Sequence, residues 1–549
     1  MLAAFAPMNP LFRRFLPLFA AAVLCGCGVP QPPQCRSVPL ASRVPTPTLV
    51  AEARKDWMIL GNPARETEWP RASVNYNAAV SKLFDQLRCH TDTWEARAAS
   101  LCTRIAPPDL EQTDPSSVDA LFPSSRVNIH PLKCRRTTSG VGVALVGWKK
   151  TSPLGSKREK FLLPNGLPHN ITAVLAFDST GAPEWRFVKR WKQEDLQIGS
   201  TIHPLAADWS APNAFYWKMC EIDKLRIQNM ILPERFTDET GIYFVTQYDP
   251  EKIPIVFVHG LASTPDEFKN MINDLAPEPW FRQKYQIWLY NYPTGNPWLF
   301  SGVKFRESMR DACAYARTKG PDCNLKRMVV VTHSMGGVIT RASVTNPGTV
   351  LYDDQYHSPI NQLKVSAETR AYIHDSLLYQ PLTEPKRVIF LAVPHRGSPA
   401  ADYRVSLWIS RLIHLPKTLT VELLDATVQS VGDIARGENP AKRLPTSIDS
   451  LSPEYVGNKS MAKIPLPGQI TFHSVIGNGW KGGVADSSDG VVPYWSSHIT
   501  PVASELIVPS FHRVTNNLQA EEEVKRILKL HLNTQTSSIR EKSRREKQT

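Results

Sequence analysis

The second half of the chain alternates short apolar runs with amphipathic stretches, and this order predicts an α/β fold with a mostly parallel sheet flanked by helices. Five runs have the length of a strand and end in loops rich in glycine, proline or polar residues: 253–258, 327–332, 386–393, 469–476 and 505–508. The stretch 519–532 carries apolar residues at helical spacing and predicts a helix after the last strand. Alternating strands and helices favour a layered sheet rather than an all-β domain.

The first half shows a different pattern, which predicts a smaller helical and β-rich module over residues 51–245. Apolar residues recur at helical spacing between 72 and 105, and this spacing indicates one or two amphipathic helices. Further on, short apolar runs at 141–148, 172–177 and 185–188 are separated by Gly, Pro, Asn and Asp, as in β-rich structure. We expect this module to bind a substrate or partner, or to brace the second domain.

A single serine stands directly after the strand predicted at 327–332. The strand leads into His333-Ser334-Met335-Gly336-Gly337, and a helical segment follows. A serine on a sharp turn between strand and helix is an arrangement that exposes a nucleophile. Thr332 stands where such turns usually carry a glycine, and its branched side chain must fit against the helix. We expect Thr332 to perturb activity without abolishing it.

The strand predicted at 253–258 ends in a loop that can supply hydrogen-bond donors. Its sequence is His259-Gly260-Leu261, and a helix start follows. In hydrolases with a serine on such a turn, this loop and the residue after the nucleophile each give one backbone N–H to the reacting oxyanion. We therefore expect Leu261 and Met335 to be the oxyanion donors. His259 is expected to brace the loop rather than act as a base.

A carboxylate after a late strand can orient a catalytic histidine and stabilise its cation. The strand predicted at 469–476 is followed by a glycine-rich loop that reaches Asp486 and Asp489. Asp489 is the predicted acid and Asp486 the alternative. Both residues can also be explained as turn formers, since Ser-Asp and Asp-Gly pairs are common in turns.

His512 lies between the last predicted strand and the last predicted helix, where an imidazole can reach the serine. His473 lies inside a predicted strand and His498 precedes the last strand, so both are weaker alternatives. The chain order Ser334, Asp489, His512 is that of the α/β-hydrolase fold and differs from that of the chymotrypsin and subtilisin folds. No ligand spacing typical of zinc occurs, so we expect no metal and no cofactor.

Five segments together resemble a known family: 253–266, 285–297, 328–337, 393–399 and 488–493. They resemble bacterial α/β-hydrolase lipoproteins, which are related to lipases and esterases and to the GPI inositol-deacylase-like group. The resemblance covers roughly residues 245–533 and implies a catalytic domain over 246–535. It implies the nucleophile, acid, base and oxyanion donors named above, and it implies no particular substrate.

An insertion at about 400–465 is predicted to form a cap over the nucleophile. Its section 405–431 is rich in apolar residues, and an apolar cap would favour acyl or lipid-like substrates. The alternative is a helix packed on the core. The sequence thus predicts a serine hydrolase that cleaves carboxylic esters through an acyl-enzyme. The alternatives are an acyltransferase on the same triad and a non-catalytic protein that binds lipids or partners.

Residues 1–26 predict a lipoprotein signal peptide. Arg13 and Arg14 precede an apolar run at 15–24, and Leu24-Cys25-Gly26-Cys27 resembles a lipobox. A run of about ten residues is too short to cross a bilayer of roughly 30 Å. We expect cleavage before Cys27, lipidation of its thiol, and anchoring to a bacterial membrane facing the periplasm; the alternative is an ordinary secretory signal. The proline-rich residues 27–50 predict an extended tether.

The formal net charge of +13 suits a protein held near anionic lipids, where each nearby Lys or Arg adds about 1 kcal/mol of attraction. No nucleic-acid recognition motif accompanies the charge, so nucleic acid is not an expected partner. The mixed charges of 536–549 predict a disordered basic tail. In an oxidising compartment Cys313 with Cys323, and Cys89 with Cys102, are candidate disulfide pairs. No oligomeric state is predicted.

Overall fold

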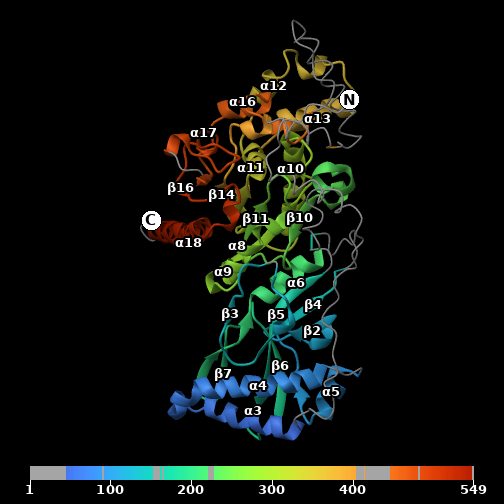
Figure 1. The fold of residues 1–549 in the computed structure, drawn as a ribbon, viewed down its shortest axis with the longest axis vertical. Coiled ribbons are helices and arrows are strands. Elements are labelled where there is room, and N and C mark those ends of the chain that lie inside the picture. The colour runs from blue at the N-terminus through green and yellow to red at the C-terminus, as the bar shows by residue number, and fades with distance from the viewer. Residues whose placement is uncertain are drawn as a thin grey trace, which may run out of the picture.

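The computed structural model describes residues 45–88, 92–130, 132–151, 161–162, 166–220, 228–402, 413, 445–479 and 483–546. The predicted signal peptide with Cys27, nearly all of the predicted tether and most of the predicted cap lie outside these residues. The described chain is elongated, with its N-terminal part at one end and the larger C-terminal part at the other (Figure 1).

The N-terminal part combines helices with a five-stranded sheet, as the sequence predicts. Strands follow the order β1-β6-β5-β4-β2, with bounds Arg104–Ile105, Pro183–Lys189, Leu167–Phe177, Val143–Lys149 and Ala120–Pro123. Helices α3 (Thr46–Leu60), α4 (Trp69–Arg88) and α5 (Trp94–Ser100) lie against the sheet at the end of the molecule (Figure 1). Tyr76 and Trp185 are fully buried between these layers. Strands β3 (Thr137–Thr138) with β9 (Ala207–Asp208), and β7 (Asp195–Ile198) with β8 (Thr201–Pro204), form two small ribbons.

Helix α3 begins at Thr46, inside the segment 27–50 that the sequence predicts to be an extended tether. Pro45 immediately precedes the helix and Pro47 lies in its first turn. A proline there costs no hydrogen bond, because the first N–H groups of a helix have no partner within the helix. Pro45 and Pro47, the last two prolines of the predicted tether, therefore mark the start of a helix, and the earlier prolines lie outside the described residues.

The C-terminal part is built on a seven-stranded sheet of order β10-β12-β11-β13-β14-β15-β16. The strands span Gly241–Phe244, Tyr285–Asn291, Ile253–Val258, Met328–His333, Pro385–Leu391, Thr471–Gly477 and Ser504–Val508. Only the edge pair β10 and β12 is antiparallel among these neighbours; the others are parallel. This order, with a serine on the turn after β13, is the α/β-hydrolase fold, and the predicted fold class is confirmed.

Helices cover both faces of this sheet (Figure 1). Helices α10 (Trp298–Arg317), α11 (Met335–Val344) and α13 (Ala367–Leu377) contribute to one core, and α8 (Lys269–Leu275), α9 (Pro279–Lys284) and α18 (Leu518–Glu546) to the other. Alternate residues of β13 enter opposite cores, Val330 in the first and Val329 in the second. Burial on both faces explains why these strands read as continuous apolar runs. Short helices α12 (Val350–Asp353), α16 (Val456–Lys463) and α17 (Tyr494–Ser497) lie in the connections.

The two parts share apolar packing and one sheet. Helix α6 (Ser210–Cys220) places Phe215 and Trp217 in the same core as Phe268 and Phe281. Strand β10 precedes residue 246, where we placed the start of the catalytic domain, yet it pairs with β12 of the larger sheet. At the other end, α18 continues to Glu546 and so includes most of the segment predicted to be a disordered tail.

The candidate disulfide between Cys313 and Cys323 does not form, because both cysteines are free. Cys313 lies on the buried face of α10 and Cys323 is exposed in the loop beyond the helix. Burial raises the pKa of the Cys313 thiol, which is therefore protonated and packs as a small apolar group. Cys102 is free and exposed, and its candidate partner Cys89 lies outside the described residues. Within the described chain no helix is both long and apolar enough to cross a bilayer.

Candidate active site

Ser334 lies on the turn between β13 and α11 in a backbone conformation that residues other than glycine rarely adopt. Its φ is 51° and its ψ is −127°. The backbone holds this turn in place, since the Ser334 N–H donates to the Leu391 carbonyl at 3.0 Å and the Ser334 carbonyl accepts from the Gly337 N–H at 2.9 Å. Backbone strain that the surrounding structure maintains is typical of functional sites.

The residues flanking the serine let helix α11 approach the sheet. A Cβ atom at Gly336 would lie 2.4 Å from the His259 carbonyl oxygen, so only glycine fits there. Thr332, the departure from the usual glycine, is fully buried in β13, and its hydroxyl lies 3.4 Å from the Ile389 carbonyl on neighbouring β14. The sheet therefore accommodates the Thr332 side chain at the position where such turns usually carry a glycine.

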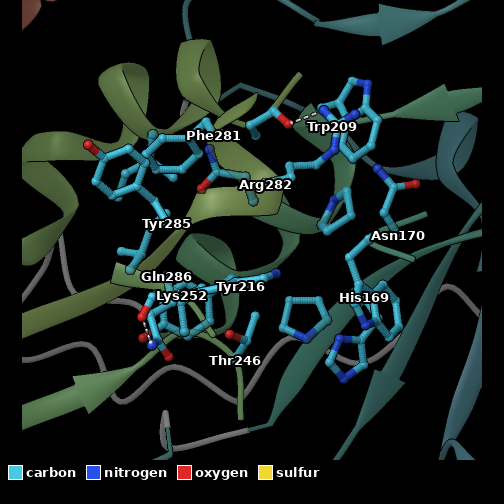
Figure 2. Close-up of a pocket in the computed structure, with 18 of the residues that line it drawn as sticks. His169, Asn170, Trp209, Tyr216, Thr246, Lys252, Phe281, Arg282, Tyr285 and Gln286 are labelled. Carbon is cyan, nitrogen blue, oxygen red and sulfur yellow. Dashed lines mark hydrogen bonds between the residues drawn. The ribbon is translucent and has the colours of Figure 1, made fainter. Parts of the chain in front are cut away.

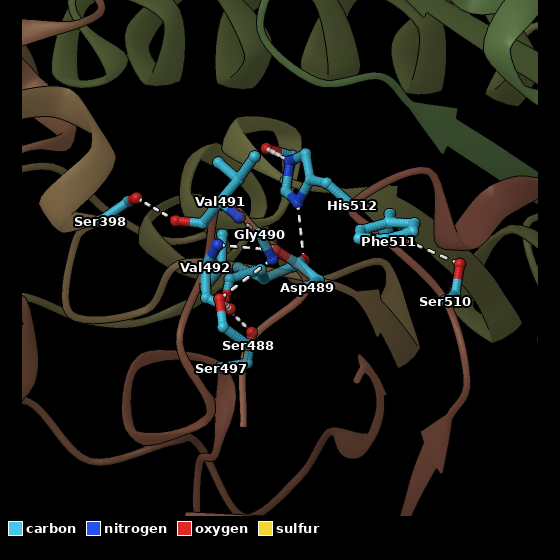
Figure 3. A network of polar contacts seen from close by, with 12 residues as sticks. Ser398, Ser488, Asp489, Gly490, Val491, Val492, Ser497, Ser510, Phe511 and His512 are labelled. Carbon is cyan, nitrogen blue, oxygen red and sulfur yellow. Dashed lines mark hydrogen bonds and ion pairs between the residues drawn. The ribbon is translucent and has the colours of Figure 1, made fainter. Parts of the chain in front are cut away.

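His512 joins the serine to Asp489. Its Nε2 lies 2.8 Å from the Ser334 Oγ, and its Nδ1 lies 2.7 Å from the Asp489 Oδ2. The other carboxylate oxygen of Asp489 accepts the backbone N–H groups of Val491 at 2.8 Å and Val492 at 2.6 Å. Figure 3 shows Asp489 held between these amides and the imidazole. Because the buried carboxylate accepts from Nδ1–H, the His512 Nε2 lone pair faces the serine hydroxyl.

The structure does not bring the alternative acid and bases to Ser334. Asp486 is exposed at the end of a short 3₁₀ turn (Val484–Asp486), and no contact with His512 is found among the described residues. His473 is buried in β15 beside Arg387, with its Nδ1 2.7 Å from the Ser504 Oγ. His498 directly follows α17, and its Nδ1 lies 2.7 Å from the Glu505 carboxylate.

The two predicted oxyanion donors come from different elements. Met335 is the first residue of α11, and the first N–H groups of a helix lack partners within the helix. Leu261 precedes Ala262, which has a φ of 52° and donates its N–H to the Thr294 hydroxyl at 3.2 Å. Among the described residues, no partner occupies the N–H of Leu261 or Met335. Both groups are thus available to a developing oxyanion.

His259 supports the loop that carries Leu261. Its ring is fully buried and stacks on Tyr292 with centroids 4.4 Å apart. The Tyr292 hydroxyl donates to the His259 carbonyl at 2.7 Å. These contacts fit the bracing role expected from the sequence.

Sequence reasoning missed a second acid and histidine pair beside the first. The Nδ1 of His333 lies 2.6 Å from the Glu267 carboxylate, and its Nε2 donates to the His512 carbonyl at 2.8 Å. The other Glu267 oxygen accepts the Gly260 N–H at 3.0 Å. One buried pair therefore ties together the serine turn, the Leu261 loop and the His512 loop. Both residues are visible in the sequence, but no motif indicates that they meet.

The electrostatics of the pair favour the charged state. Burial acts to raise the pKa of Glu267, but the charge of His333 and the hydrogen bonds to the carboxylate outweigh it and lower that pKa to about 2. Burial likewise acts to lower the pKa of His333, and the charge of Glu267 raises it overall. His333 can hold both protons, one for Glu267 and one for the His512 carbonyl. The described residues contain no group of three or more His, Cys, Asp or Glu arranged to hold a metal ion.

No family model matches this chain, and no curated protein matches it in sequence. Among solved structures, the mature lipase BlEst2 of Bacillus licheniformis is 18% identical, with 50% of this chain and 91% of that chain covered and a TM-score of 0.29. The Staphylococcus hyicus lipase is 12% identical, with 54% and 99% covered and a TM-score of 0.33. Esterase B of Lactobacillus rhamnosis is 12% identical, with 60% and 96% covered and a TM-score of 0.30. The strand order of the larger sheet, with Ser334 on the turn after β13, shows the α/β-hydrolase fold.

Proposed function

We propose that this protein is a serine hydrolase that cleaves carboxylic esters with Ser334 as nucleophile, His512 as base and Asp489 as the acid that orients it. The unbroken chain of hydrogen-bond distances from the Ser334 Oγ through His512 to Asp489 carries the proposal. The left-handed conformation of Ser334, which lifts its hydroxyl out of the sheet, supports it.

The proposed reaction passes through an acyl-enzyme. The Ser334 Oγ attacks the ester carbonyl while the His512 Nε2 takes its proton, and Leu261 and Met335 donate N–H groups to the oxyanion. His512 then protonates the leaving alcohol. Water, deprotonated by the same imidazole, attacks the acyl group and releases a carboxylate and free Ser334. Asp489 keeps His512 in one tautomer and stabilises its cation in both steps.

Apolar side chains beside the triad favour substrates with an apolar acyl or lipid-like group. Phe511, next to His512, is 62% exposed, and Val491, two residues after Asp489, is 40% exposed. Figure 3 shows Val491 and Phe511 on either side of the His512 ring. Exposed apolar side chains gathered at a reactive centre mark a surface for apolar ligands.

The two alternatives make different predictions. A protein that only binds requires His512 to lie beyond hydrogen-bond reach of Ser334, and the distance of 2.8 Å gives this alternative no support. An acyltransferase would use the same triad with an alcohol in place of water. Analysis of products with an added alcohol acceptor separates the two: the proposed hydrolase forms mainly free acid.

A fluorophosphonate probe tests the proposal, because it labels only serines that a neighbouring base activates. We expect one label per molecule, on Ser334, and labelling at least a hundred times slower in His512→Ala. Intact-mass spectrometry with peptide mapping measures both. His498→Ala is a matched control that removes another partly exposed imidazole and should label like the wild type. A folded wild-type protein that stays unlabelled would contradict the proposal.

We further propose that the chain is exported and held at a bacterial membrane, facing the periplasm, by a lipid on Cys27. The support is the apolar run at 15–24, the lipobox-like Leu24-Cys25-Gly26-Cys27 and the net charge of +13. Several acyl chains on one residue anchor firmly, since each buried CH₂ contributes about 0.8 kcal/mol.

Cys27→Ala is expected to abolish lipidation and leave an unprocessed precursor. Metabolic labelling with a fatty acid and the size of the protein on a gel measure this result. Cys25→Ala is the matched control: it removes a neighbouring thiol but leaves the cleavage site, so lipidation should persist. Normal labelling of Cys27→Ala would rule out this anchor.

A further inference from the structure

A cavity lies between the N-terminal part and the seven-stranded sheet, at the edge of the sheet opposite to Ser334. Lys252 directly precedes β11, and Tyr285 and Gln286 begin β12, so the cavity meets the amino ends of these strands. The active site follows their carboxyl ends, about 20 Å away along a six-residue strand. Figure 2 shows Lys252, Tyr285 and Gln286 on one side of the cavity, with His169 and Trp209 of the N-terminal part on the other.

The walls of the cavity are mainly aromatic. Six rings line it, those of Trp191, Trp209, Tyr216, Trp217, Phe281 and Tyr285. Its volume is about 210 Å³. A cavity needs a volume of about 10–15 Å³ to hold one water, so this cavity has room for a small organic molecule. Apolar, ring-lined cavities between domains are typical ligand sites.

The described residues that line the cavity carry positive charge and no carboxylate. The lysine and arginine among them are Lys252 and Arg282, and none of them is Asp or Glu. Arg282 already has partners: it pairs with Glu194, donates to the Ala276 carbonyl at 2.8 Å and lies 3.8 Å above the Trp209 ring. His169 is neutral at pH 7, because burial lowers its pKa to about 4.

Lys252 is the cationic lining residue whose charge has no partner among the described residues. No hydrogen bond or ion pair joins its ammonium group to any described residue, although the side chain is half-buried. Burial lowers its pKa, and the charge of Asp249 offsets this effect only in part. A half-buried cation without a partner costs free energy, and a bound anion removes that cost.

We propose that this cavity binds a small carboxylate with an apolar body, such as a medium-chain or aromatic carboxylic acid, whose charge pairs with Lys252 and whose apolar part lies among the rings. One free ammonium matches one negative charge, which favours a carboxylate over a dianionic phosphate ester. Because the cavity and Ser334 lie at opposite edges of the sheet, this site is independent of the proposed esterase activity.

Lys252→Met separates binding from folding. Methionine keeps the unbranched apolar stem, one atom shorter than lysine, and removes a charge that has no partner among the described residues, so the melting temperature should stay the same or rise. The affinity for octanoate should fall at least tenfold, while Lys252→Arg should retain it. Lys284→Met is the matched control, since Lys284 is an exposed lysine on α9.

Octanoate with a terminal diazirine is the probe, and it is titrated and photo-crosslinked on the full chain beside the matching alcohol. Expected results are saturable crosslinks in residues 209–217 and 281–287, and binding of the carboxylate, but not of the alcohol, that depends on Lys252. Crosslinks only around Ser334, no saturable crosslink, or equal effects of Lys252→Met and Lys284→Met would each overturn the proposal. Thermal unfolding of each variant shows that it is folded.

Discussion

Replacing Ser334 by alanine is expected to lower kcat for ester hydrolysis about a million-fold. The acyl-enzyme cannot form without the Oγ, and the members of a catalytic triad act as a unit. His512→Ala should cost about as much, and the double variant should lose little more. Asp489→Asn should lower kcat about 10⁴-fold, because the amide favours the wrong tautomer of His512. Steady-state rates on short-chain esters measure these losses.

Ser510→Ala is the control for this series. Ser510 lies two residues from His512, and its hydroxyl donates to the Phe511 carbonyl rather than to the triad. It should retain nearly full activity. If Ser334→Ala keeps more than a hundredth of the wild-type kcat, the serine is not the nucleophile.

Glu267→Gln is expected to lower the free energy of unfolding by about 3–5 kcal/mol at pH 6, because it leaves the buried His333 cation without its partner. The change should also lower kcat about a hundred-fold with little effect on KM, since His333 holds the His512 carbonyl and misplacement of a catalytic group is costly. Denaturant unfolding and steady-state kinetics measure the two effects. Glu522→Gln, an exposed acid on α18, is the control and should change neither.

The pH dependence of this pair has a definite sign. The folded pKa of Glu267, about 2, lies below the ordinary value of 4.5 for a glutamate, so its contribution to stability is present above pH 4.5 and is lost as pH falls toward 2. The folded pKa of His333 lies above the ordinary value of 6.5 for a histidine, so its contribution to stability is present below pH 6.5 and is lost as pH rises through the folded pKa. The stability difference between wild type and Glu267→Gln should therefore be largest between pH 4.5 and 6.5. An equal difference at all pH values would mean that the pair is uncharged.

The positions of Ser334, Asp489 and His512 could be predicted from the sequence because each follows an apolar strand. Parallel strands deliver their carboxyl ends to one edge of a sheet, so residues far apart in the chain meet there. The same apolar runs identify strands β11 and β13 to β16, since burial on both faces leaves little room for polar residues. Local pattern and topology together were sufficient for this part of the site.

Features that depend on contacts between side chains from distant parts of the sequence could not be predicted in this way. Glu267 lies in the 3₁₀ turn Pro265–Phe268 and His333 ends β13, and neither spacing nor composition joins them. The disulfide expected from the closeness of Cys313 and Cys323 in sequence fails because one thiol faces the core and the other faces solvent. Strand β10 is four residues long and antiparallel, so no run of strand length indicates that it belongs to the larger sheet.

A fragment of the chain that lacks strand β10 would lose the cover of one edge of the seven-stranded sheet. A fragment that starts at residue 246 would keep every residue of the proposed triad, yet it would expose the outer backbone N–H and C=O groups of β12. An uncovered strand edge pairs readily with another copy and leads to aggregation. In the whole chain β10 covers that edge, and the Phe161 carbonyl in turn accepts the Phe244 N–H at 2.6 Å. The solubility of the seven-stranded sheet thus depends on residues that are synthesised before most of it.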